Sequence, residues 1–141
     1  MHAQIKASPD NTAENMQRIL NALAAAEINI DAIAPDFDPP HVRVLVGHDD
    51  VNGAMAALSD AGLTPQIKSA LGLRIPNSPG ALKNALDGIA RRGLKVESVL
   101  VLAESDVPDT ARVSIGVART VIAGWDDEFE TIQAEIEQEI A

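Results

Sequence analysis

The sequence contains one segment twice, and this repeat constrains the fold more than any other feature. Residues Asn11–Ile30 align without a gap with Asn77–Val96, and the apolar positions of the two segments coincide. The coinciding pairs are Met16 with Leu82, Leu20 with Leu86, Leu23 with Ile89, Ile28 with Leu94 and Ile30 with Val96. The period is about half of the chain, which predicts a duplicated small domain rather than a solenoid. We therefore expect one copy in residues 1–69 and the other in residues 70–141.

The first copy has the pattern of an α+β domain. Alternating or apolar runs predict strands, and 3–4 spacing of apolar residues predicts helices. The order strand, helix, strand, strand, helix, strand predicts a ferredoxin-like βαββαβ unit, with both helices on one face of an antiparallel sheet. The expected strands are Ala3–Ala7, Ile28–Ala34, Val42–Val46 and Thr64–Ser69, with a turn at Pro35–Pro40. Strict alternation would place Ile28 and Ile30 on one face of their strand and Ile33 on the other.

The second copy repeats this order but lacks its last strand. We expect strands at Leu71–Ile75, Val96–Leu102 and Ala111–Val117, and a final helix at 127–140 with strongly acidic outer faces, interpreted as solvated. Without a fourth strand, Leu71–Ile75 would be a bare edge, which favours strand exchange or oligomerisation.

Composition excludes several classes of function. A net charge of −10 argues against sequence-independent binding of nucleic acid, which needs clustered cationic side chains. No apolar run is long enough to span a bilayer, and the N-terminus lacks the apolar core of a signal peptide. We therefore expect a cytoplasmic protein without a membrane partner. The chain has no cysteine, and its three histidines lack the spacing of a zinc site. No catalytic or phosphate-binding motif is present, so we expect neither an enzyme nor a bound metal or cofactor.

The two copies differ where their first helices begin. The second copy has Asn77-Ser78-Pro79-Gly80, and the first has Asn11-Thr12-Ala13-Glu14. We expect Ser78 to cap a helix that Pro79 opens, and Asn11 or Thr12 to cap its counterpart, with Glu14 nearby to complete a capping box. A helix N-terminus offers N–H donors to a carboxylate, and a glycine there lets a ligand approach the backbone. The same four residues also make an ordinary helix start, so spacing alone leaves both interpretations open.

These residues resemble the ACT domain, a small regulatory module that binds amino acids. The resemblance lies in Arg74-Ile75-Pro76-Asn77-Ser78-Pro79-Gly80-Ala81-Leu82 followed by Gly93-Leu94-Lys95-Val96. It covers the second copy up to its missing strand, and the first copy through the repeat alignment. In serine-sensing members of that family, one asparagine in this turn and one on the second strand of a neighbouring domain hold the ligand.

The resemblance implies one composite site and one degenerate site. The composite site would combine the turn of the second copy with Asn29 of the first, because the equivalent of Asn29 in the second copy is Lys95. Its predicted residues are Asn77, Ser78, Pro79, Gly80, Ala81, Leu82 and Asn29. The degenerate site would contain Asn11, Thr12, Ala13, Glu14 and Lys95, where the Glu14 carboxylate repels a ligand carboxylate. The link between Thr64–Ser69 and Leu71–Ile75 is too short to cross a sheet, which leaves open a site formed between two chains.

The predicted function is that of a sensor for a small amino acid, acting through its oligomeric state or its contacts with a partner protein such as a metabolic enzyme. We expect a homodimer. The alternatives are a dimerisation or interaction module without a ligand, and a regulatory subunit of a metabolic enzyme.

Overall fold

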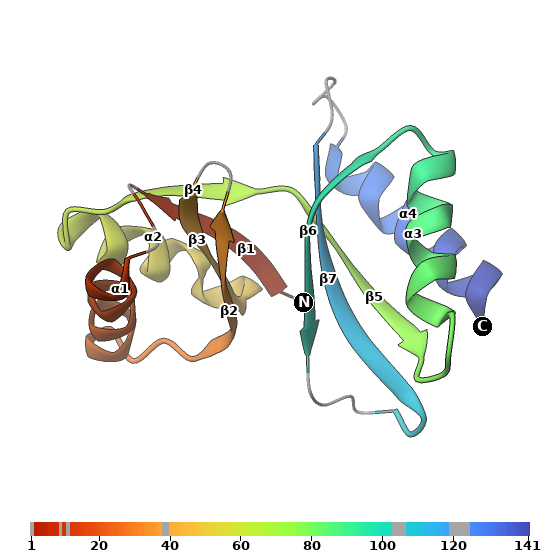
Figure 1. The fold of residues 1–141 in the computed structure, drawn as a ribbon, viewed down its shortest axis with the longest axis horizontal. Helices are drawn as coiled ribbons and strands as arrows, with labels where there is room; N and C mark the ends of the chain where they lie inside the picture. The colour runs from red at the N-terminus through yellow and green to blue at the C-terminus, as the bar shows by residue number, and fades with distance from the viewer. Residues whose placement is uncertain (1, 9, 11, 38–39, 103–106, 119–124) are drawn as a thin grey trace. The chain divides into compact units, whose positions relative to one another are not determined.

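The computed structural model describes residues 2–8, 10, 12–37, 40–102, 107–118 and 125–141 (Figure 1). The chain divides into two compact units, Met1–Lys68 (unit 1) and Ser69–Ala141 (unit 2), and each unit has its own sheet. Among the described helices, none is both long and apolar enough to cross a membrane.

Unit 1 is a complete βαββαβ unit. Its elements are β1 (His2–Ser8), α1 (Ala13–Ala25), β2 (Ile30–Phe37), β3 (Pro40–Gly47), a 3-10 turn (His48–Asp50), α2 (Val51–Asp60) and β4 (Thr64–Lys68). The strands form an antiparallel sheet in the order β2-β3-β1-β4. The first and last strands of the unit are therefore neighbours, as the ferredoxin-like arrangement requires.

Unit 2 repeats the order without the last strand. Its elements are β5 (Ala70–Pro76), α3 (Ala81–Arg91), β6 (Lys95–Leu102), β7 (Thr110–Ala118) and α4 (Trp125–Ile140). The described strands form an antiparallel sheet in the order β5-β7-β6, which is the order of unit 1 with the fourth position missing. The predicted fold class, including the incomplete second repeat, is confirmed.

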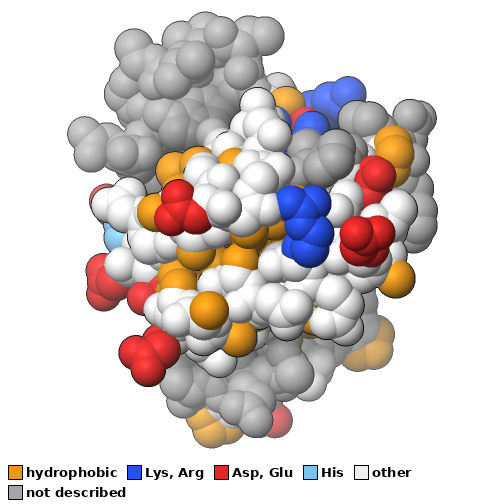
Figure 2. All heavy atoms as spheres, turned by 90° about the vertical axis from the view of Figure 1, so that its left-hand side faces the viewer, with side chains coloured by type: hydrophobic (Ala, Val, Ile, Leu, Met, Phe, Trp, Pro, Cys, Tyr) orange, Lys and Arg blue, Asp and Glu red, His pale blue; other side chains and the backbone are white. Residues whose placement is uncertain are grey.

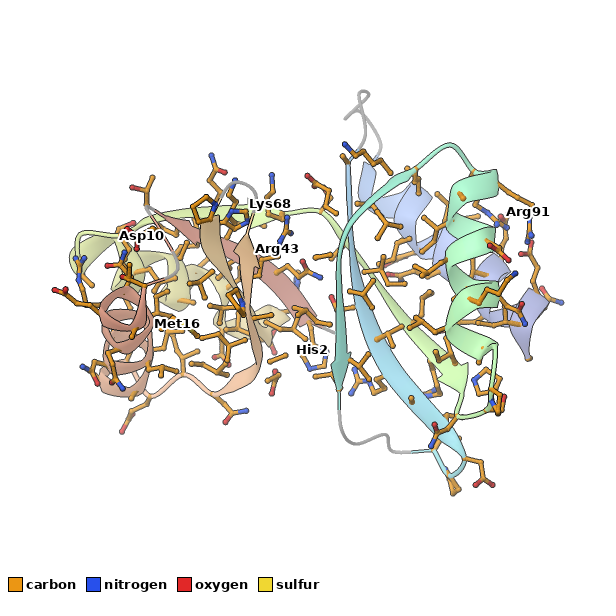
Figure 3. All side chains as sticks on the ribbon, in the orientation of Figure 1. His2, Asp10, Met16, Arg43, Lys68 and Arg91 are labelled. Atoms are coloured by element: carbon orange, nitrogen blue, oxygen red, sulfur yellow. The ribbon has the colours of Figure 1, made fainter. Side chains whose placement is uncertain are left out.

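Each unit has its own aliphatic core between its helices and one face of its sheet (Figure 3). In unit 1, Ile19 and Leu23 of α1 and Leu58 of α2 are fully buried against the sheet. In unit 2, Ile89 of α3 and Ile136 of α4 are fully buried in the same way. The 3–4 spacing of these residues places them on one face of each helix, which is why the repeat pattern predicts the core.

A bulge at the same place in both copies corrects one prediction. The register shifts between Ile30 and Ala32 in β2, and between Val96 and Ser98 in β6. The extra residues are Asp31 and Glu97, which are equivalent in the repeat (97 − 31 = 66). Because a bulge moves the following residues to the opposite face, Ile33 packs on the core together with Ile28 and Ile30. The prediction that Ile33 faces away from them is wrong.

The predicted turn at Pro35–Pro40 is also too long. β2 continues to Phe37, and β3 begins at Pro40. Pro35 lies opposite Val42 inside the β2–β3 pairing. A proline is tolerated there because β2 is an edge strand, so no second neighbour needs its missing N–H.

An arginine joins the two helices of unit 1. Arg18 donates from Nη2 to the carbonyl of Ala61 just after α2, and from Nη1 to Asn15 Oδ1 at 3.2 Å.

Figure 2, which faces the side of Figure 1 where α1 and α2 lie, shows an apolar strip across the middle of this face with acidic side chains scattered around it. On the coloured part of this face, the acidic side chains are dispersed rather than gathered into one patch.

The acidic outer faces of α4 are not simply solvated. Glu135 and Glu139 accept hydrogen bonds from Arg92 of α3, at 3.1 and 2.8 Å from its Nη2. The Oε1 atom of Glu137 accepts a hydrogen bond at 2.7 Å from the backbone N–H of Arg74 in β5. Gln133 Oε1 accepts one at 2.8 Å from the N–H of Gly72. The prediction of a bare β5 edge is therefore wrong, because side chains of α4 cover two of its donors.

Candidate functional site

The predicted ligand turn connects β5 to α3 and lies at the surface of unit 2. Its four residues, Asn77, Ser78, Pro79 and Gly80, are all exposed. The turn is tied to the rest of the unit through the backbone, since the N–H of Asn77 donates to the carbonyl of Asp109 at 2.8 Å. Asp109 directly precedes β7 and has a left-handed backbone with φ of 58°. Sequence reasoning missed this second turn beside the first, and only the pairing of β5 with β7 brings the two together.

Gly80 determines how the helix begins. It has φ of 85°, a left-handed conformation that favours glycine, and it is the N-cap of α3. The helix therefore starts at Ala81, whose N–H donates to the carbonyl of Ser78 at 3.2 Å in a turn. The prediction that Ser78 caps a helix opened by Pro79 is wrong, because the left-handed residue interrupts the helix after Pro79.

This start leaves the N-terminus of α3 without a side-chain cap. Gly80 has no side chain to accept from the first N–H groups, and among the described residues no side-chain hydrogen bond caps the helix. A Cβ added at Gly80 would find no heavy atom within 4 Å, so the space beside this backbone is open. Ala81 is buried and Leu82 packs on the core, so these two predicted site residues anchor the helix and offer only their backbone.

The equivalent end of α1 is closed. Thr12 is its N-cap, and its Oγ1 accepts from the N–H of Asn15 at 3.2 Å. The carboxylate of Asp10 then accepts from the N–H of Thr12 at 3.1 Å and from Nδ2 of Asn15 at 2.5 Å. These hydrogen bonds, led by the one from the Thr12 backbone, hold the pKa of Asp10 below its usual value. Figure 3 labels Asp10 at this end of α1.

Two expectations about this end need correction. Ala13 is the first residue of α1, so Glu14 is the second and does not occupy the third position that a capping box requires. Asn15 takes that position, and its amide binds Asp10 instead of the cap backbone. Asn11 lies outside the described residues. Sequence reasoning missed Asp10, although an aspartate two residues before a threonine cap is itself a turn signal.

Asn29 and Lys95 are exposed residues at equivalent places in the two units. Asn29 precedes β2, and its Nδ2 donates to Asp31 Oδ1 at 2.8 Å. The other oxygen of Asp31 lies 3.2 Å from Nε2 of His2. Lys95 is the first residue of β6. Asn29 belongs to unit 1 and the Asn77–Gly80 turn to unit 2, so their combination in one site stays a prediction. Among the described residues, no group of three acidic or histidine side chains is placed to hold a metal ion.

Comparison with known proteins identifies the fold. By sequence, the chain matches no family model and no curated protein. Solved structures match over nearly its whole length. Protein BT0572 from Bacteroides thetaiotaomicron has a TM-score of 0.69 and 21% identity, covering 95% of this chain and 86% of that one. The ligand-free regulatory subunit of aspartate kinase from Thermus thermophilus has a TM-score of 0.69 and 17% identity, covering 99% and 91%.

A third structure agrees with these two. The regulatory subunit of aspartate kinase from Thermus flavus has a TM-score of 0.64 and 19% identity, covering 99% of this chain and 93% of that one. At such identities the likeness shows the fold alone. The fold is that of two consecutive ACT-like repeats, the second without its last strand, as the resemblance implies.

Proposed function

We propose that this chain is a non-catalytic regulatory module that binds the carboxylate of a small amino acid at the N-terminus of α3. One observation carries the proposal: the two equivalent helix starts differ in whether they are occupied. At the start of α1, the side chain of Thr12 caps the helix and the carboxylate of Asp10 binds the N–H of Thr12. The helix α3 instead begins at Gly80 with no side-chain cap. The fold supports the regulatory part, since two of the similar structures are named as regulatory subunits of an enzyme.

The chemistry of the open end suits a zwitterion. The first N–H groups of a helix have no partner within the helix, and its dipole favours an anion there by about 0.3–1 kcal/mol. A ligand carboxylate would accept from the N–H groups after Gly80, whose missing side chain leaves room for it. The exposed amide of Asn77 has an oxygen that could accept from the ligand ammonium and an NH₂ group that could donate.

Asp10 explains why we expect one site per chain rather than two. Its carboxylate accepts from the N–H of the cap residue Thr12 and from Nδ2 of Asn15, so a negative charge already lies beside the start of α1. Glu14 adds a further negative charge in the first turn of α1. The carboxylate of a free amino acid would have to approach the carboxylates of Asp10 and Glu14, so the first repeat should not bind the ligand.

The output of binding would be a change in assembly. A ligand shifts an equilibrium only by its difference in affinity for the two states. We propose that the liganded and free chains differ in self-association, or in contact with a metabolic enzyme, as the names of the similar regulatory subunits suggest.

The test is a thermal-shift screen of the purified chain against the standard amino acids. A ligand at one hundred times its dissociation constant adds about 2.7 kcal/mol of stability, which is readily visible. We expect one or a few small amino acids to shift the melting temperature, and we expect Asn77→Ala to abolish the shift. Asn11→Ala removes the equivalent residue of the first copy and is the matched control, which should retain the shift.

Two further variants separate parts of the proposal. Gly80→Ala places a Cβ in the open space and strains the left-handed backbone. The variant should therefore lose more free energy of ligand binding than free energy of unfolding. Asn29→Ala tests the composite site, because loss of ligand binding in this variant would mean that a residue of unit 1 contributes to the site. No shift with any amino acid at millimolar concentration contradicts the proposal and favours a ligand-free interaction module.

A further inference from the structure

The edge of β5 is the place where unit 2 departs from unit 1. The copies are offset by 66 residues (77 − 11), so Gly72 corresponds to Lys6 and Arg74 to Ser8. In unit 1 these positions of β1 pair with β4, Lys6 with Gln66 and Ser8 with Thr64. In unit 2 the described strands offer no such neighbour, because β5 pairs only with β7.

Two side chains of α4 accept hydrogen bonds from the N–H groups that such a strand would bind. Gln133 Oε1 accepts from the N–H of Gly72 at 2.8 Å, and Glu137 Oε1 accepts from the N–H of Arg74 at 2.7 Å. The spacings agree, since four residues of helix rise about 6 Å and two residues of strand about 6.8 Å. The next position on this edge is Pro76, which has no N–H to satisfy. The two acceptors therefore match the donors that this part of the edge presents.

Other contacts of α4 hold these acceptors in place. Ile132 and Ile136 anchor the helix in the core of unit 2. On another side, Arg92 of α3 binds Glu135 and Glu139. Gln133 and Glu137 therefore lie on a helix that is also held on two other sides, so the position of α4 does not depend on their contacts with β5 alone.

We propose that β5 is a self-association edge that Gln133 and Glu137 hold closed, and that the partner it accepts when opened is β5 of a second copy. This proposal does not depend on the ligand site. The sequence of β5 suits antiparallel pairing about a two-fold axis at Leu73, which sets Gly72 of each copy opposite Arg74 of the other. Each arginine then faces a glycine, so no like charges meet. The contact is isologous, because both copies contribute the same edge strand, so it closes at a dimer.

The pairing also uses the backbone groups that α4 now occupies. In an antiparallel ladder, alternate residues exchange both N–H and C=O bonds with the residue opposite. Gly72 and Arg74 point their N–H groups away from β7, as their bonds to α4 show. With the axis at Leu73, these two residues become the hydrogen-bonded pair on each side of it.

The first experiment removes the block. The double variant Gln133→Ala/Glu137→Ala is compared with Glu130→Ala/Gln138→Ala, which removes the same residue types from exposed positions of the same helix. Light scattering after size exclusion, repeated over a range of concentrations, should show a new dimer, or a dimer doubled in mass, for the first variant only. Equal assembly of both variants and wild type overturns the proposal, as does growth into an open series of larger species.

The second experiment tests the register and the intact chain. The chain has no cysteine, so Gly72→Cys/Arg74→Cys in the opened variant introduces its only thiols. We expect disulfide-linked dimers on mild oxidation, and the absence of interchain links overturns the register. In wild type, amide exchange should be slow at Gly72 and Arg74. Rapid exchange at both would overturn the block itself, whatever happens to the folding of the variants.

Discussion

Replacing Glu27 with glycine should stabilise unit 1, because Glu27 has the backbone of a glycine. It has φ of 57° and is equivalent to Gly93, which has φ of 74° (93 − 27 = 66). Each follows the C-cap of its helix, and in unit 1 the N–H of Ile28 donates to the carbonyl of Leu23 at 2.9 Å to complete a Schellman motif. A left-handed conformation costs an L-residue roughly 1–2 kcal/mol, and glycine loses about 0.5–1 kcal/mol more backbone entropy on folding.

The difference gives an expected gain of about 0.5–1 kcal/mol for Glu27→Gly, or roughly 2–8 °C in the melting temperature of a domain this size. Gly93→Ala should lose about 1 kcal/mol from the backbone alone, since an added Cβ there meets nothing within 4 Å. Urea and thermal unfolding measure both. Glu27→Ala keeps the strain while removing the carboxylate, and is the control. If Glu27→Gly is no more stable than Glu27→Ala, the backbone argument fails.

Three further predictions concern stability. Asp10→Asn should lower the free energy of unfolding at neutral pH. The difference from wild type should shrink as the pH falls through the lowered pKa of Asp10, because a carboxyl group with a depressed pKa stabilises the fold only while it is ionised. A difference that does not change with pH would contradict this. Hydrogen bonding to Arg92 likewise lowers the pKa of Glu139, so Arg92→Met should loosen α4 near pH 7 and matter less in acid, measured by amide exchange at Gly72. Gly88→Ala in α3 should stabilise unit 2 by about 0.5–1 kcal/mol, since its Cβ would meet neighbours only at ordinary contact distances from 3.5 Å; destabilisation would show that α4 needs the space.

The fold was predictable because its signals are local. Apolar spacing in Met16–Leu23 and its repeat in Leu82–Ile89 locates both first helices and their buried faces. The bulges at Asp31 and Glu97 were not predictable, because one extra residue changes the face of a strand without changing its composition. Ile33 and Val99 are equivalent in the repeat, and each follows a bulge at the same place. A comparison of the two copies therefore does not reveal the bulge.

For the candidate site, the sequence predicted only where its turn lies in the fold. The Asn77–Gly80 turn lies between β5 and α3 as expected, but the left-handed Gly80 moves the helix start beyond Pro79 and removes the cap assigned to Ser78. The contacts of Gln133 and Glu137 depend on how α4 lies against β5, and no spacing within α4 indicates which strand atoms it meets. Such contacts are tertiary, so the acidic residues are indistinguishable in the sequence from a solvated face.

The most direct test of the central claim follows backbone amides of isotope-labelled protein by NMR during titration with a pool of the standard amino acids. We expect the resonances of Gly80, Ala81, Leu82 and Lys83 to shift and saturate with one site per chain, while those of Thr12 and Asn15 stay in place. Shifts at the start of α1 equal to those at the start of α3, or no shift at either, would contradict the claim that only the second repeat offers an open helix end.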